Sequence, residues 1–160
     1  MVENSKNLLI KLTFLISVIA LVSAFFIEYV LGHQPCNLCI LERIPYLLAI
    51  IIILLNFKFS HYEKFFILLL LIIFLAGAII SLYHLGIEQG LIQESLVCDL
   101  KSGSNLLSKE EILKQLQEKN VSCKDVTFKI FGLSLTSYNI LISLLITVST
   151  GKIYFNYEKN

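Results

Sequence analysis

Four long apolar runs constrain this chain more than any other feature. They extend over about residues 8–31, 38–57, 65–85 and 133–155. A helix of about 20 apolar residues crosses the ~30 Å hydrocarbon core of a bilayer, and each run is close to that length. The predicted fold class is therefore an all-α membrane protein, with a single domain over residues 1–160 built as a four-transmembrane-helix bundle. The second run is the weakest because it takes Glu42 and Arg43 into its first turns.

Composition excludes several classes of protein. The chain is 56% hydrophobic and only 16% charged, whereas soluble domains carry about 25% charged residues. Its net charge of +1 provides no basic surface of the kind that attracts nucleic acid. We expect membrane lipid, and no nucleic acid, among its partners.

The first run has an alternative interpretation as a secretory signal peptide. Lys6 and Lys11 precede an apolar stretch, and residues 22–24 (Val-Ser-Ala) resemble a cleavage site with small residues. Because the apolar run continues through residues 25–27, we expect a retained transmembrane helix.

The distribution of lysines predicts the orientation. Four spans put both termini and the connection after the second run on one side of the membrane, where lysines lie close to the span ends. Lysines on the other side lie mainly in one long segment that also contains acidic residues. Because the positive-inside bias acts through residues near the spans, we predict cytoplasmic termini and periplasmic cysteines.

That long polar segment covers about residues 86–132. Residues 108–111 (Ser-Lys-Glu-Glu) have the form of a helix capping box. Apolar residues at positions 112, 113 and 116 then share one helix face. The segment thus carries a short amphipathic helix, which either packs within the loop or lies on the bilayer surface.

Cys36 and Cys39 form the first candidate site. Cysteines three residues apart at a helix start have Cα atoms roughly 5–6 Å apart, which suits a disulfide. Pro35 suits the first helical position, and a helix N-terminus favours a thiolate. The pattern predicts a dithiol with one acidic, reactive cysteine.

Zinc sites use the same spacing. A zinc ion would need Cys98 and Cys123 as further ligands, but these are not a second close pair, and no histidine lies at ligand spacing beside them. Covalent haem attachment requires a histidine after Cys39, where the chain has Ile40. We therefore expect no metal.

Arg43 follows Cys39 by four residues, one turn along the same predicted helix. An arginine at the membrane edge is costly without a partner. Either it polarises a carbonyl oxygen of a bound acceptor and stabilises negative charge on Cys39, or it snorkels to the interface and pairs with Glu42.

Cys98 and Cys123 bracket most of the polar segment. If they are joined, they close a loop of about 25 residues and stabilise the fold by roughly 3.5 kcal/mol in the chain-entropy model. They are either a structural staple or a second redox pair that exchanges with the first by thiolate attack on a disulfide.

His84 and Glu88, at the end of the third run, are four residues apart and can share a helix face. His84 either donates to an acceptor oxygen or handles its proton, or it is an interfacial histidine with its hydrogen bonds satisfied.

The run Cys36-Asn-Leu-Cys39-Ile-Leu-Glu42-Arg43 resembles the disulfide bond formation protein B family. The four spans, the short outer loop with the close pair, the long loop with the separated pair, and Phe131-Gly132-Leu133 extend the resemblance over essentially the whole chain. It implies a bacterial inner-membrane enzyme that reoxidises a periplasmic thioredoxin-like thiol oxidase. The electrons would pass to a membrane quinone, either ubiquinone or menaquinone.

The resemblance also implies roles for single residues. The partner's thiolate would attack Cys98, and the released Cys123 would exchange with Cys36. Cys39 would face the quinone beside Arg43. His84 corresponds to a family histidine at the quinone, although its spacing to Cys98 differs by one residue.

Three other classes of protein share some of these features. Vitamin K epoxide reductase-like enzymes also have a close pair and a loop pair, but in the reverse order along the chain. A structural or assembly subunit of a membrane complex would use Cys98 and Cys123 only as a staple. A metal transporter needs charged groups inside its spans, and the third and fourth runs have almost none.

Overall fold

The computed structural model describes residues 2–93, 98, 122–124, 129–130 and 132–158. Its long helices are α1 (Val2–Tyr29), α3 (Ile44–Lys58), α4 (Glu63–Glu88) and α6 (Leu135–Glu158). The short helix α2 (Asn37–Leu41) precedes α3, and the 3-10 turn η1 (Ser60–Tyr62) precedes α4. Strands β1 (Lys129–Ile130) and β2 (Leu133–Ser134) pair antiparallel just before α6. The amphipathic helix predicted near residues 108–116 lies outside the described residues.

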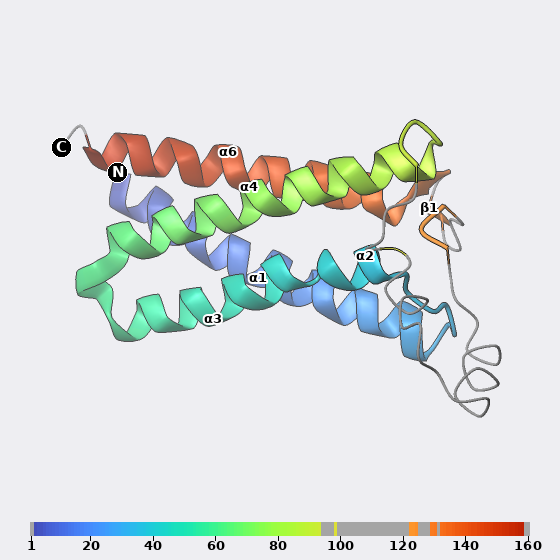
Figure 1. Cartoon of the computed structure of the whole chain (residues 1–160). Coiled ribbons are helices and arrows are strands. Elements are labelled where there is room, and N and C mark those ends of the chain that lie inside the picture. The colour runs from blue at the N-terminus through green and yellow to red at the C-terminus, as the bar shows by residue number, and fades with distance from the viewer. Residues whose placement is uncertain (1, 94–97, 99–121, 125–128, 131, 159–160) are drawn as a thin grey trace, which may run out of the picture.

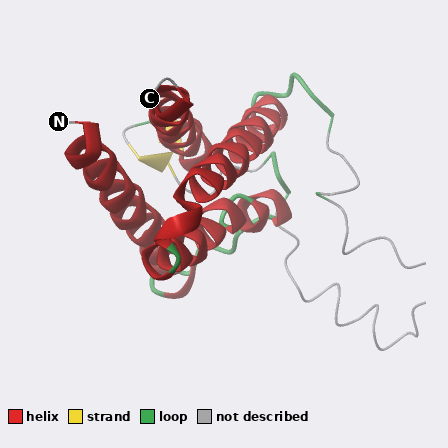
Figure 2. Cartoon of the chain, turned by 90° about the vertical axis from the view of Figure 1, so that its left-hand side faces the viewer, coloured by secondary structure: helices red, strands yellow, loops and turns green. Residues whose placement is uncertain are grey.

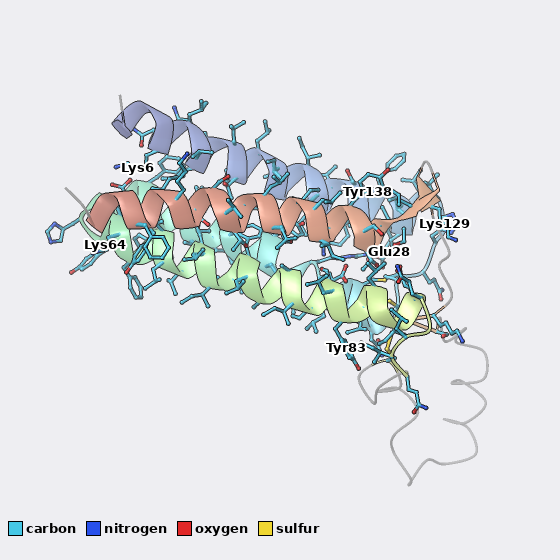
Figure 3. All side chains as sticks on the ribbon, turned by 90° about the horizontal axis from the view of Figure 1, so that it is seen from above. Lys6, Glu28, Lys64, Tyr83, Lys129 and Tyr138 are labelled. Atoms are coloured by element: carbon cyan, nitrogen blue, oxygen red, sulfur yellow. A yellow bond between two sulfur atoms is a disulfide. The ribbon has the colours of Figure 1, made fainter. Side chains whose placement is uncertain are left out.

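The long helices form one bundle (Figures 1 and 2). Both termini lie at one end of it, together with the α3–α4 connection, while α2 and β1 lie at the opposite end (Figure 1). Helix α4 packs most extensively against α6, and α3 contacts both α1 and α4. Lys6 and Lys64 mark the end with the termini, and Glu28 and Tyr138 mark the other (Figure 3).

The predicted membrane architecture is confirmed. Within the described residues, four helical segments have the length and apolar character of membrane spans: Lys6–Tyr29, Asn37–Lys58, Glu63–Glu88 and Leu135–Phe155. Large apolar side chains point outward from them, as a lipid environment requires; Leu145 and Val148 are both 68% exposed. Helix α4 extends beyond its predicted run at both ends, because polar residues can continue a helix past its apolar stretch. Helix α1 ends, and α6 begins, two residues inside the predicted runs.

Helix α1 ends at Tyr29, two residues before the predicted boundary. The amide of Leu31 donates to the carbonyl of Phe26, and Gly32 follows with φ of 71°. A left-handed glycine after the last turn is a common helix stop because it has no Cβ to clash. The turn directs the chain toward the first cysteine pair.

The second span is interrupted near Pro45, where the sequence predicts a lost helix hydrogen bond and a kink. Helix α2 ends at Leu41 and α3 begins at Ile44, so Glu42 and Arg43 lie between them. The cause is Pro45, which has no N–H to donate and whose ring clashes with the carbonyl four residues earlier. The prediction that Pro35 occupies the first helical position is wrong, because Cys36 is the N-cap of α2.

Gly77 lets α4 approach the α3 N-terminus closely. A Cβ at this position would lie 3.0 Å from Cγ of Pro45, whose ring cannot rotate away. Nearby, Tyr46, Ala49, Ile53 and Phe74 are at most 5% exposed and form part of the central core. The contact between Gly77 and Pro45 therefore fixes the spacing of α3 and α4.

We expect Gly77→Leu to lower the melting temperature of the detergent-solubilised protein. Overpacking costs about 1–3 kcal/mol, which outweighs the gain of about 1 kcal/mol from replacing a helical glycine. Ala76→Leu is the matched control, because Ala76 is exposed on the same helix. Equal melting temperatures for the two variants would contradict this packing account.

Candidate functional site

The dithiol is built into the start of α2. Cys36 caps the helix, and its Sγ accepts a hydrogen bond from the backbone N–H of Cys39 at 3.2 Å. Both cysteines are free thiols; Cys36 is buried and Cys39 half-buried. The sequence predicted this arrangement of a cysteine pair at a helix N-terminus, but the helix begins two residues later than expected.

Cys36 is the more acidic cysteine in this geometry. A hydrogen bond from the Cys39 thiol is the main factor that lowers the pKa of the Cys36 thiol below its ordinary value, and burial opposes it. His84 and the backbone N–H of Cys39 act in the same direction as the Cys39 thiol. These groups favour the thiolate at Cys36 because each offers a donor or a positive charge to the sulfur.

His84 contacts the dithiol from α4. Its Nε2 lies 3.6 Å from Sγ of Cys36, and its Nδ1 lies 2.8 Å from Oε1 of Glu42. The imidazole is only 1% exposed. A carboxylate on one ring nitrogen fixes the orientation of the other, so Glu42 holds His84 against Cys36.

A second carboxylate lies on the other side of the imidazole. Glu88 Oε1 is 3.8 Å from His84 Nε2, which confirms that these two residues share a helix face. Thr136 of α6 donates to Glu88 Oε1 at 2.6 Å, and its Oγ1 also lies 3.2 Å from His84 Nδ1. The ring is thus flanked by carboxylates from two different segments.

Asn139 of α6 completes this polar cluster. Its Nδ2 donates to Glu42 Oε2 at 3.0 Å and to Ser81 Oγ at 2.7 Å, and its Oδ1 accepts from the Tyr46 hydroxyl. Sequence reasoning missed Asn139, Ser81 and Thr136. The sequence did contain an indication of these three residues. Each is a polar residue within or beside an apolar run, where a polar side chain needs a hydrogen-bond partner.

Arg43 is held on the α1 side of the site. Its Nη1 is 2.5 Å from Oε2 of Glu28, and its guanidinium lies 5.3 Å from the ring centroid of Phe25. Glu42, the partner considered from the sequence, instead contacts His84. The guanidinium has five N–H donors in a planar fork, so an ion pair with Glu28 leaves donors for a bound molecule.

A cavity of about 480 Å³ opens beside these groups. Cys39, Arg43, Glu42 and His84 all line it. Most of its remaining wall is apolar and comes from α1 and α6, including Ile16, Ile19 and Ile142. A mostly apolar pocket with a few convergent polar groups is the usual form of a small-molecule site.

Cys98 and Cys123 are joined in a disulfide, with their Cα atoms 5.9 Å apart. Cys123 is only 2% exposed and packs in one buried cluster with Cys36 and Leu38. The carbonyl of Cys98 accepts from Nδ2 of Asn37 at 3.2 Å. The structure therefore brings the loop disulfide against the dithiol, and Cys123 also lines the cavity.

Comparison with known proteins identifies a family. A family profile described as "Disulfide bond formation protein DsbB" matches residues 6–152. An uncharacterized protein of Rickettsia prowazekii (strain Madrid E) is 35% identical over 150 residues, covering 91% of this chain and 86% of the relative. The disulfide bond formation protein B of Nitrosomonas europaea is 27% identical over 152 residues, which cover 85% of this chain and 89% of the relative. No solved structure matches.

The profile covers the first three apolar helices, most of the fourth and all four cysteines. The chain therefore belongs to the disulfide bond formation protein B family, and its four apolar helices make it a multi-pass membrane protein.

Proposed function

We propose that this protein reoxidises a periplasmic thioredoxin-like thiol oxidase and passes the electrons to a membrane quinone. It would reside in the bacterial inner membrane with cytoplasmic termini and periplasmic cysteines. Family membership supports a membrane-bound disulfide oxidoreductase. The proposed electron transfer from a partner to a quinone rests on one observation. The loop disulfide contacts the free dithiol, beside a largely apolar cavity.

The first exchanges take place between the partner and the loop pair. A partner thiolate attacks Cys98, forming a mixed disulfide and releasing the thiolate of Cys123. That thiolate attacks Cys36 of an oxidised Cys36–Cys39 pair, which releases Cys39 as a thiolate. Each step breaks one S–S bond and forms another, as thiol–disulfide exchange requires.

Resolution returns the loop pair to its oxidised form. The partner's second thiolate displaces Cys98 from the mixed disulfide, and Cys98 then attacks Cys123 and releases Cys36. The net result is an oxidised partner and a reduced Cys36–Cys39 pair. The described state, with a joined loop pair and two free thiols, corresponds to the stage after this transfer and before the electrons leave the protein.

His84 and the N-terminus of α2 would stabilise Cys36 when it leaves as a thiolate. The Cys39 amide and His84 Nε2 both contact its sulfur, and donors at a leaving sulfur make it a better leaving group. Glu42 acts through His84, because it fixes the ring. We assign Glu42 a positioning role.

The cavity fits a quinone head group. Its volume of about 480 Å³ lies within the roughly 300–1,000 Å³ of typical ligand sites, and its apolar wall suits a ring that arrives from the bilayer. A bound quinone would accept two electrons and two protons as the Cys36–Cys39 disulfide reforms. Arg43 lines the cavity and would donate to a quinone oxygen while Glu28 and Phe25 hold it in place.

A structural subunit with a stapling disulfide would need only Cys98 and Cys123. It would have no use for a second, free pair packed against the staple and contacted by a buried histidine. This contact is the reason that we favour the redox relay.

Trapping the first intermediate tests the relay. In a Cys123→Ser variant that also lacks Cys36 and Cys39 (both Ser), the partner can attach only to Cys98. We expect a mixed disulfide with a thioredoxin-like thiol oxidase after mild oxidation, visible as a shifted band on a non-reducing gel. The matched chain that keeps Cys123 and has Cys36, Cys39 and Cys98 replaced by Ser should give little or no band. An equal band with Cys123 alone, or no band in the folded variant with Cys98, would contradict the assigned entry point.

Arg43→Ala should raise the apparent KM for the quinone about tenfold. A hydrogen bond from a charged donor contributes about 1.5–3 kcal/mol, and 1.4 kcal/mol corresponds to a factor of ten. Arg43→Lys should give an intermediate KM because lysine keeps the charge but not the planar fork. Steady-state quinone reduction measures both values. An unchanged KM in the alanine variant would indicate that Arg43 only anchors α3 to α1.

A further inference from the structure

Three metal-binding atoms converge at the dithiol. The sulfurs of Cys36 and Cys39 and a ring nitrogen of His84 all lie within 4.8 Å of one another. Cysteine thiolates and imidazole nitrogens are the preferred ligands of Zn²⁺ and similar ions, and two cysteines separated by two residues are a usual pair of ligands. The histidine is not near them in the sequence, because α4 supplies it, so the sequence alone led us to expect no metal.

The spacing between the Cys36 sulfur and His84 Nε2 matches a tetrahedral ion. Zn–S bonds of about 2.3 Å and Zn–N bonds of about 2.0–2.1 Å place a sulfur and a nitrogen ligand roughly 3.6 Å apart around one ion. The distance from Cys36 Sγ to His84 Nε2 is 3.6 Å. These two ligands therefore need no rearrangement to share an ion.

The surrounding groups are those that support a metal site. A metal-binding histidine usually donates a hydrogen bond from its other ring N–H to a carboxylate. His84 Nδ1 lies 2.8 Å from Glu42 Oε1. Asn139 in turn fixes Glu42. The Cys39 amide donates to the Cys36 sulfur, which stabilises the negative charge that a metal-bound thiolate keeps.

The cavity provides access to the fourth coordination position. Glu88 lines it, but its Oε1 lies 3.8 Å from His84 Nε2, whereas nitrogen and oxygen ligands of one Zn²⁺ are about 3.3 Å apart. A water molecule from the cavity would therefore complete the tetrahedral coordination.

We propose that the reduced Cys36–Cys39 pair, together with His84, binds one thiophilic divalent cation of the zinc class. Oxidation removes the site, because two sulfurs joined in a disulfide are no longer thiolate ligands. The site thus depends on the redox state of the protein. Where the proposed function also holds, the cation blocks turnover because it occupies the sulfurs that would reduce the quinone.

Cobalt titration tests the site directly, because tetrahedral Co²⁺–thiolate sites absorb strongly. The protein is the full chain in detergent with Cys98→Ser and Cys123→Ser, so that Cys36 and Cys39 are its only thiols. We expect charge-transfer and d–d bands that saturate at one Co²⁺ per reduced chain and vanish when Zn²⁺ is added. The same chain with an oxidised Cys36–Cys39 pair should give no bands.

Two substitutions separate this site from unspecific binding to thiols. His84→Ala should weaken cobalt binding at least tenfold, and Glu42→Gln should weaken it about 10–100-fold, as the loss of a group that orients a ligand does. His61→Ala is the control, because His61 lies by η1 at the other end of the bundle, and it should bind cobalt as the parent does.

The absence of bands in the folded, reduced parent, equal binding by the oxidised chain, or unchanged affinity in His84→Ala would each overturn the cation site. Quinone turnover is measured separately on the chain with all four cysteines. Cobalt binding without turnover supports the cation site while it contradicts the proposed function. Quinone turnover without cobalt binding supports the proposed function and contradicts the cation site.

Discussion

The contact between Glu42 and His84 is the interaction on which the rest of this structure depends. A carboxylate that is 8% exposed and an imidazole that is 1% exposed are costly inside an apolar bundle unless each is paired and hydrogen-bonded. Their pairing joins the break between α2 and α3 to α4, and Asn139 and Thr136 extend it to α6. One polar cluster thereby aligns three segments and holds the ring against Cys36.

This cluster also explains why the chemistry sits at one end of the bundle. The break at Glu42 and Arg43 ends α2 after little more than one turn, so the dithiol stays at the bundle end, near the loop disulfide. The same break sends Glu42 toward His84 and Arg43 toward Glu28. The cavity is lined by Glu42, His84 and Arg43 and by apolar residues of α1 and α6, so a molecule bound in it would lie beside the dithiol.

The sequence was sufficient to predict the four spans, the cysteine pair at a helix start and the shared face of His84 and Glu88, because each follows from local periodicity or spacing. It could not predict that His84 contacts Cys36, since residues 48 positions apart meet only through helix packing. The partner of Arg43 was missed for the same reason: Glu28 lies on α1. The interruption of the second span was predictable only in part. Pro45 indicates a kink, but it does not indicate that Glu42 contacts His84 and Arg43 contacts Glu28.

The most direct test of the account is quinone reduction by the purified protein, with a reduced thioredoxin-like thiol oxidase as electron donor and either ubiquinone or menaquinone as acceptor. The account predicts steady turnover that is lost in Cys39→Ser, although this variant keeps the fold and melting temperature of the parent. Absence of turnover with both quinones in the folded parent protein, or turnover that survives Cys39→Ser, would contradict it.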